Sequence, residues 1–153
     1  VYAAGGPAPH TPRMFGFQAA GAAPLVLGHD VENPETVATA IRIGKPASGS
    51  KALAARDDSN GLISSVTDEQ ILDAQAFLAA KEGIFVEPAS AAGVAGLLAL
   101  KQSGDLPAGQ RIVITVTGNG LKDIDTALSR TELSTEAVEP STDRVAALLG
   151  LHQ

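Results

Sequence analysis

The sequence contains no cysteine and no tryptophan, and aromatic residues make up only 3% of its 153 residues. The absence of cysteine excludes disulfide bonds, thiolate catalysis and cysteine-ligated metal sites. Because aromatics are scarce, the core must be built from small and branched side chains, which supply most of the 44% apolar content. That apolar share is ordinary for a soluble globular protein, and the length suits one domain or a large piece of one.

Basic residues are also few. The 11 lysines and arginines against 17 acidic residues give a net charge of −6, which argues against a nucleic-acid partner because phosphate binding needs a basic face. His10, His29 and His152 lie far apart without ligand spacing, so no metal site is expected. The longest apolar stretch, Val94–Leu100, is far short of the roughly 20 residues that span a membrane. No secretion signal opens the sequence, and we therefore expect a soluble, cytoplasmic protein that handles small molecules.

Helical and extended patterns alternate along the chain. The predicted extended segments are Met14–Gln18, Gly61–Val66, the very short Ile84–Val86, and Arg111–Thr117. The predicted helices are Pro34–Ile43, Lys51–Asp58, a helix from Thr67 to a cap at Gly83, Ala89–Gln102, a short turn at Asp123–Ser129, and Thr142–Leu149. This alternation indicates an α/β fold, which we expect to be three-layered, with helices on both faces of a mostly parallel sheet.

Two stretches carry clear helix-start signals. Asn33 can cap a helix that begins at Pro34, and this predicts a helix that continues to about Ile43. Thr67 and Gln70 have the spacing of a capping box, in which each side chain bonds a backbone amide of the other residue.

Two glycines, Gly93 and Gly96, fall inside the predicted helix Ala89–Gln102. Each costs about 1 kcal/mol relative to alanine in a helix. We expect them only where a sheet or another helix approaches closely.

The clearest strand signal leads into the first candidate site. Six consecutive β-branched residues, Ile112 to Thr117, predict a strand covered on both faces, as in a parallel sheet. The strand ends in a polar, glycine-rich loop, Thr117-Gly118-Asn119-Gly120, and ligands of open α/β sheets bind at such carboxyl ends. The glycines would let a flat ligand approach, and the Thr117 hydroxyl could bond a ring nitrogen. Alternatively, Asn119 and Gly120 simply make a turn, since a lone Gly-x-Gly is a weak dinucleotide signal.

Two further segments could contact a ligand. In Phe85–Ala92 a short strand runs into a helix start, where Glu87 or Ser90 could bind a ligand or merely cap the helix. In the third segment Arg42, Lys45 and Ser48 could bind a phosphate, although basic residues at a helix C-terminus are commonly solvated.

These three motifs, together and in this order, resemble the threonine synthases of the pyridoxal-phosphate (PLP)-dependent, fold type II family. The matching stretches are Pro12–Pro24, Pro34–Ser48, Phe85–Leu98 and Val116–Leu128. One departure lies at Lys45 and Gly49, where the family leads us to expect Asn and Trp.

The resemblance implies that residues 1–153 are the C-terminal portion of a fold type II catalytic domain, with 1–12 irregular. The complete enzyme would convert O-phosphohomoserine and water to threonine and phosphate, with PLP as the electron sink. The family's pyridine-nitrogen contact maps onto Thr117, with Gly118, Asn119 and Gly120 beside it and Glu87 near the cofactor.

The resemblance also implies what this sequence lacks. The family's Schiff-base lysine and its glycine-rich phosphate loop precede the first matching stretch, and neither appears here. Lys122 is not that lysine, so no catalytic residue is assigned and the chain alone is expected to be inactive.

Other interpretations stay open. The chain could belong to another fold type II enzyme, such as a threonine dehydratase or a cysteine synthase, although the run Gly16–Pro24 favours threonine synthase. It could also be a non-catalytic α/β fragment whose exposed sheet edge associates with a partner, for example as a homodimer.

Overall fold

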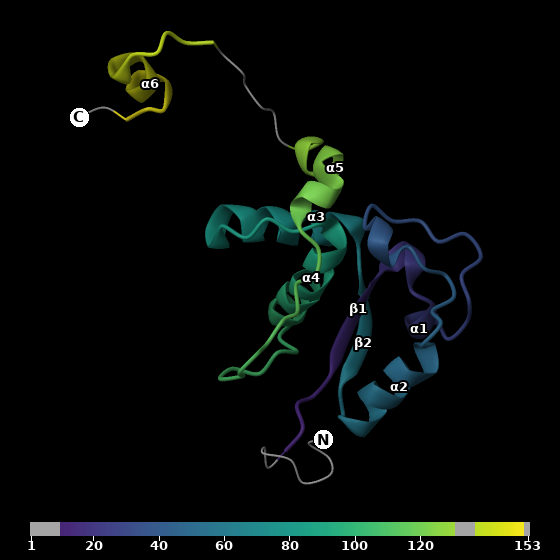
Figure 1. Ribbon diagram of the computed structural model, residues 1–153. Coiled ribbons are helices and arrows are strands. Elements are labelled where there is room, and N and C mark those ends of the chain that lie inside the picture. The colour runs from purple at the N-terminus through teal and green to yellow at the C-terminus, as the bar shows by residue number, and fades with distance from the viewer. Residues whose placement is uncertain (1–9, 131–136, 152–153) are drawn as a thin grey trace.

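The computed structural model describes residues 10–130 and 137–151 (Figure 1). Residues 1–9, most of the stretch that we expected to be irregular, lie outside the described residues.

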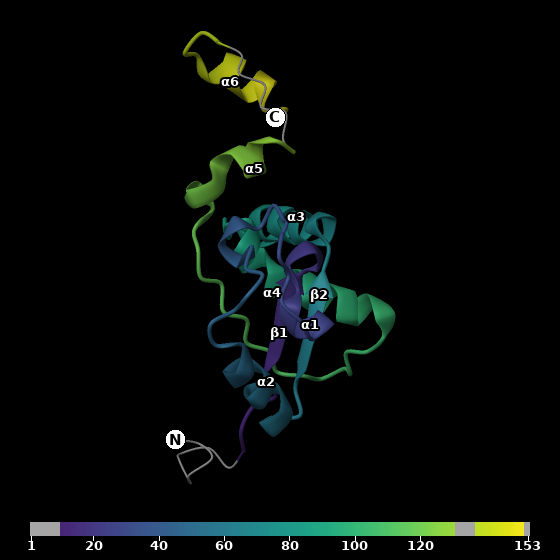
Figure 2. The same cartoon turned by 90° about the vertical axis from the view of Figure 1, so that its right-hand side faces the viewer.

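A two-stranded parallel sheet lies at the centre of the layered part of the chain. Strands β1 (Phe15–Ala19) and β2 (Leu62–Val66) pair along their whole length. Helix α4 (Pro88–Ser103) packs on one face of the pair, and α1 (Pro24–Leu27) and α2 (Gly49–Asp58) lie on the other (Figures 1 and 2). The expected α/β class, with a parallel sheet between helices, is confirmed.

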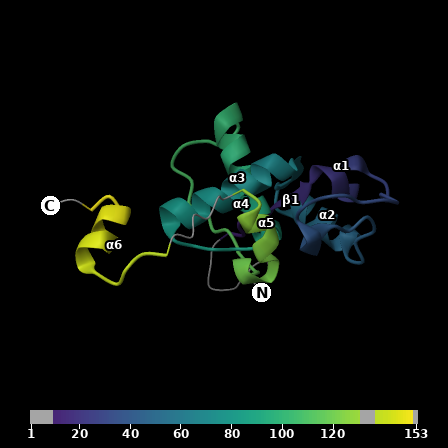
Figure 3. The ribbon, with the colours of Figure 1, turned by 90° about the horizontal axis from the view of Figure 1, so that it is seen from above.

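The described residues also form further helical elements. They are the 3₁₀ turns Ala20–Ala22, Thr39–Ile41 and Gly120–Asp123, helix α3 (Asp68–Phe77) with its wider last turn Leu78–Glu82, α5 (Ile124–Leu128) and α6 (Thr142–Leu148). Helix α6 lies apart from the sheet layers in all three views, as Figure 3 shows from above. No helix in residues 10–130 and 137–151 is long and apolar enough to cross a membrane.

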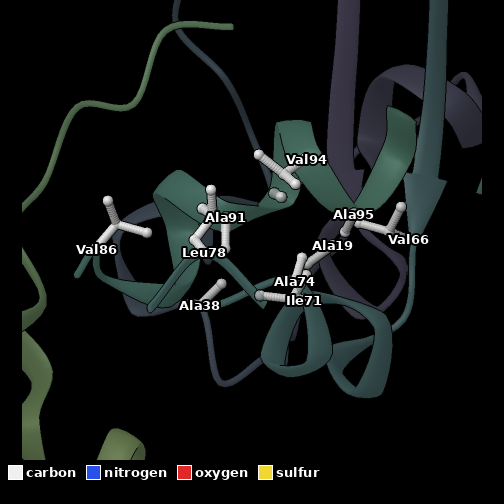
Figure 4. Close-up of a cluster of buried hydrophobic side chains, with 11 residues drawn as sticks. Ala19, Ala38, Val66, Ile71, Ala74, Leu78, Val86, Ala91, Val94 and Ala95 are labelled. Atoms are coloured by element: carbon white, nitrogen blue, oxygen red, sulfur yellow. The ribbon is translucent and has the colours of Figure 1, made fainter. Parts of the chain in front are cut away.

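Small side chains fill the core, as the shortage of aromatics requires. Ile71 and Ala74 of α3 are fully buried and face the α4 residues Ala91 and Ala95 (Figure 4). Phe17 is the one aromatic residue packed against this cluster among the described residues. The buried residues of the hydrophobic core cluster are Ala19, Ala38, Val66, Ile71, Ala74, Leu78, Val86, Ala91, Ala92, Val94 and Ala95.

The two helix glycines lie where the sequence predicted close packing. A Cβ on Gly96 would overlap the ring of Phe17, and one on Gly93 would lie 3.2 Å from Cγ2 of Ile114. Helix α4 therefore approaches strand β1 closely at Gly96 and the unpaired segment 111–117 at Gly93.

The predicted capping box is confirmed. The Gln70 amide donates to Thr67 Oγ1 at 3.2 Å, and the Thr67 amide donates to Gln70 Oε1 at 2.9 Å. The helical run also ends as predicted, at Gly83 with a φ of 66°.

The helix predicted over Pro34–Ile43 is wrong, because Asp68 and Arg42 form hydrogen bonds with backbone groups that the helix would need. Thr36 Oγ1 donates to Asp68 Oδ1 at 2.5 Å, and the Val37 amide donates to Asp68 Oδ2 at 3.0 Å. Arg42 Nη2 donates to the Thr36 carbonyl at 2.6 Å, which occupies the acceptor of a first helical turn. Only the single 3₁₀ turn Thr39–Ile41 remains.

The prediction of a doubly covered strand at Arg111–Thr117 is also wrong for this chain. The segment joins no ladder among the described residues, and its exposed fractions reach 89% at Val113. A strand exists only where a neighbouring backbone pairs with it, and β1 and β2 pair with each other. The run of β-branched residues indicates a segment suited to a sheet. It does not indicate whether a neighbouring strand is present to pair with that segment.

Candidate functional site

The glycine-rich loop lies directly against the segment that precedes α4. The Glu87 amide donates to the Gly118 carbonyl at 3.0 Å, and the Gly120 amide donates to the Phe85 carbonyl at 3.2 Å. These two bonds flank an isolated antiparallel bridge. The structure therefore brings the first and second candidate motifs together into one site.

Ser90 fastens the loop from the first turn of α4. Its Oγ accepts hydrogen bonds from the amides of Thr117, at 3.1 Å, and of Gly118, at 2.7 Å. The same Oγ lies 3.1 Å from Thr117 Oγ1. Glu87 occupies the N-cap position of α4, as one alternative expected, but its side chain makes no capping hydrogen bond. Ser90 instead holds the loop.

The loop needs glycine because of close approach. A Cβ on Gly118 would overlap the carboxylate of Glu87, and one on Gly120 would meet the Phe85 ring at 2.6 Å. Asn119 has a local role, since its Oδ1 accepts from the Leu121 amide at 2.9 Å and caps the following 3₁₀ turn. The turn-forming interpretation of Asn119 is therefore correct, and it holds alongside the packing role of its two glycine neighbours.

A buried carboxylate lies next to the loop. Glu87 is 7% exposed as a whole residue, and its side chain is 9% exposed. Its Oε2 lies 3.1 Å from Nζ of Lys122, a side chain that is 63% exposed. Removing a carboxylate from water is costly unless a cation or hydrogen-bond donors compensate it. Lys122 is thus the counter-ion that the sequence did not reveal.

Gln75 supports the same region from α3. Its Nε2 donates to the Val86 carbonyl at 2.8 Å, and the residue is 5% exposed. Sequence reasoning missed this contact because a glutamine inside an amphipathic helix gives no sign of the distant carbonyl that it bonds.

Thr117 is an exposed residue whose Oγ1 lies 3.1 Å from Ser90 Oγ. Its hydroxyl has one partner among the described contacts, Ser90, and so keeps hydrogen-bonding capacity for a ligand. The arrangement offers a hydroxyl beside a loop whose backbone carries no side chain at two positions. A flat, polar ring with a nitrogen or oxygen at its edge suits such a surface.

The basic residues of the third candidate segment bond to groups outside the glycine-rich loop. Both Nε and Nη2 of Arg42 donate to the Thr36 carbonyl, at 3.0 and 2.6 Å. Lys45 Nζ lies 2.9 Å from Asp30 Oδ2, and the hydrogen bond to that carboxylate raises the pKa of Lys45. The contacts of Arg42 and Lys45 are therefore local, and neither joins the loop.

Two surface hollows in the described chain lie away from Thr117. One of about 290 Å³ lies between α1 and α2 and is lined by Pro24, His29 and Leu53 among others. Another of about 310 Å³ lies against α6. Neither of these two hollows is lined by residues of the glycine-rich loop.

The chain is similar in sequence to known enzymes. Residues 1–118 match the family model described as "Pyridoxal-phosphate dependent enzyme". The threonine synthase of Synechocystis sp. is 53% identical over 140 residues, which cover 91% of this chain and 36% of that protein. The threonine synthase of Mycobacterium leprae is 57% identical over 127 residues, covering 83% and 35%. The chain therefore spans about a third of the length of these relatives.

Solved structures show a similar fold. A fungal L-serine ammonia-lyase from Rhizomucor miehei has a TM-score of 0.58 at 23% identity, covering 76% of this chain and 40% of that one. Maize serine racemase also has a TM-score of 0.58 at 23% identity, covering 77% and 39%. The similarities bear out the family resemblance, the fold class and the cofactor class that the motifs implied.

Proposed function

Because the chain belongs to the family of pyridoxal-phosphate-dependent enzymes, we propose that it is the C-terminal portion of the catalytic domain of a threonine synthase. The complete enzyme converts O-phosphohomoserine and water to threonine and phosphate. The observation that carries the proposal is the 2.7 Å bond from the Gly118 amide to Ser90 Oγ. It joins two of the stretches that resemble threonine synthases into a single wall.

The residues at this wall fit the edge of the PLP ring. Thr117 offers a hydroxyl to the pyridine nitrogen, and Gly118 and Gly120 leave the backbone open to a flat ligand. Asn119 keeps the turn, and Glu87 lies directly behind Gly118. When bound, PLP supplies an electron sink for the carbanions that form on the substrate. The chain's own residues position the ring, and its Lys122 balances the charge of Glu87.

The covalent attachment of the cofactor is proposed to lie elsewhere. Lys122, the lysine nearest the loop in sequence, is paired with Glu87 at 3.1 Å. We therefore propose that the reactive lysine and the phosphate-binding loop belong to the two thirds of the relatives' length that this chain does not span. The chain alone is then inactive and binds PLP weakly or not at all.

This part of the proposal has a direct test. The purified chain is mixed with PLP, and its visible absorbance is recorded before and after borohydride. We expect no stoichiometric reduced adduct. An adduct traceable to one lysine would show that the chain carries its own reactive group.

The activity is tested in the complete enzyme that contains this chain. We expect phosphate release from O-phosphohomoserine, and little 2-oxo acid from L-serine or L-threonine. The reverse pattern would favour the second candidate, another fold type II enzyme such as a dehydratase. The identities of 53% and 57% to threonine synthases favour the first.

We propose further that the substrate is a small molecule, that the enzyme works in the cytoplasm and that two copies associate as a homodimer. Light scattering tests the last point.

A further inference from the structure

The hydroxyl of Ser90 is saturated as an acceptor. Backbone amides of Thr117 and Gly118 both donate to its Oγ, at 3.1 and 2.7 Å. A serine hydroxyl has two acceptor lone pairs and one proton. These two amides therefore use both lone pairs, and only the proton of Ser90 remains.

The Ser90 hydroxyl proton has one acceptor among the described contacts. Thr117 Oγ1 lies 3.1 Å from Ser90 Oγ, and either atom could donate on distance alone. Because the lone pairs of Ser90 are taken, Ser90 donates and Thr117 accepts. Ser90 is 5% exposed, so water does not compete for its proton. The proton of the Thr117 hydroxyl then points away from Ser90.

We propose that Ser90 is a positioning residue that sets the direction of the Thr117 hydroxyl, so that Thr117 donates a hydrogen bond to the ligand. Thr117 is an exposed residue, so its hydroxyl proton is available to an incoming group. The partner is an acceptor atom at the edge of a ring. Its identity as the pyridine nitrogen of PLP rests on the proposed function.

The direction of the two protons can be measured in the complete wild-type enzyme before PLP is added. In mixed H₂O and D₂O, a slowly exchanging hydroxyl splits the ¹³C resonance of its own Cβ into two lines. We expect the Ser90 Cβ to split, because its proton is buried and bonded, and the Thr117 Cβ to give one averaged line. Splitting at Thr117 alone, or at neither residue, would overturn the assignment.

The consequence for ligand binding is tested by a mutant cycle in the complete enzyme, with PLP affinity read from its absorbance. Ser90→Ala is expected to weaken PLP binding about ten-fold, and Thr117→Val by a similar factor. Since Ser90 acts through Thr117, the double variant should bind no more weakly than Thr117→Val alone. Ser103→Ala, at the other end of α4, is the matched control and should change nothing.

A PLP analogue with carbon in place of the ring nitrogen separates a positioning role from a merely structural one. Ser90→Ala should not weaken its binding, because Thr117 then has no acceptor to meet. An equal loss for PLP and the analogue, or additive losses in the cycle, would refute the inference. If the wild-type enzyme binds no PLP, the proposed function fails, and the Cβ measurement still decides the direction of the two hydroxyls.

Discussion

Glu87 and Lys122 form an ion pair of 3.1 Å between a side chain that is 9% exposed and one that is 63% exposed. The asymmetry matters, because the buried partner cannot find water if the exposed one is removed. The pair lies beside the loop proposed to hold the ring of PLP, so loss of the ion pair would disturb the site where the ligand binds.

Removing the exposed partner should therefore destabilise the chain. Lys122→Met is expected to lower the free energy of unfolding by about 1 to 2 kcal/mol, since a buried carboxylate is left without its cation. Urea unfolding measures the change. Adding Glu87→Gln to Lys122→Met should recover most of the loss. Lys51→Met, at an exposed position without an ion pair in the described contacts, is the control and should stay within about 0.5 kcal/mol.

Gly118 should not tolerate a side chain. Its added Cβ would overlap the Glu87 carboxylate, so Gly118→Ala is expected to cost about 1 to 3 kcal/mol and to displace the loop. Gly16→Ala provides the comparison, because a Cβ there meets only Ile63 Cγ1, at an ordinary 3.6 Å. Thermal unfolding of the two variants measures the difference. Equal melting temperatures would show that the loop adjusts freely.

Gly93 and Gly96 allow a closer comparison of alanine substitutions, because both lie in the same helix, α4. Alanine is favoured over glycine by about 1 kcal/mol inside a helix. At Gly96 the overlap with Phe17 outweighs this preference, and Gly96→Ala should destabilise by about 1 to 3 kcal/mol. At Gly93 the neighbour is a single methyl group, Cγ2 of Ile114, at 3.2 Å, so a small shift offsets the helix preference and Gly93→Ala should be close to neutral. A larger loss at Gly93 than at Gly96 in urea unfolding would contradict this packing.

Local signals in the sequence predicted local structure well. The Thr67 capping box and the Gly83 cap involve residues close together along the chain, and both are confirmed. The glycines of α4 predicted a close approach, although not the ring of Phe17 that makes it.

Distant partners explain the failures. Nothing near Pro34 in the sequence shows that Asp68 captures the Thr36 hydroxyl and the Val37 amide, which prevents the helix. The candidate site shows the same limit. Thr117 and Glu87 could be nominated from motifs, whereas the ion pair with Lys122 becomes visible only when the chain is folded.

The exposed β-branched segment leads to a prediction about association. Residues 112–117 carry no charge, belong to no regular secondary structure and pair with no strand among the described residues. Such an edge is a template for pairing with another backbone, and we expect the isolated chain to form dimers or larger species through it. A lysine placed in the paired edge would lose water at a cost of more than about 1.4 kcal/mol, so Val113→Lys should raise the dissociation constant at least about ten-fold. Val138→Lys, at a residue that is 39% exposed and outside the segment, is the matched control. Light scattering across a concentration series measures both, and a wild-type chain that stays monomeric throughout would refute the prediction.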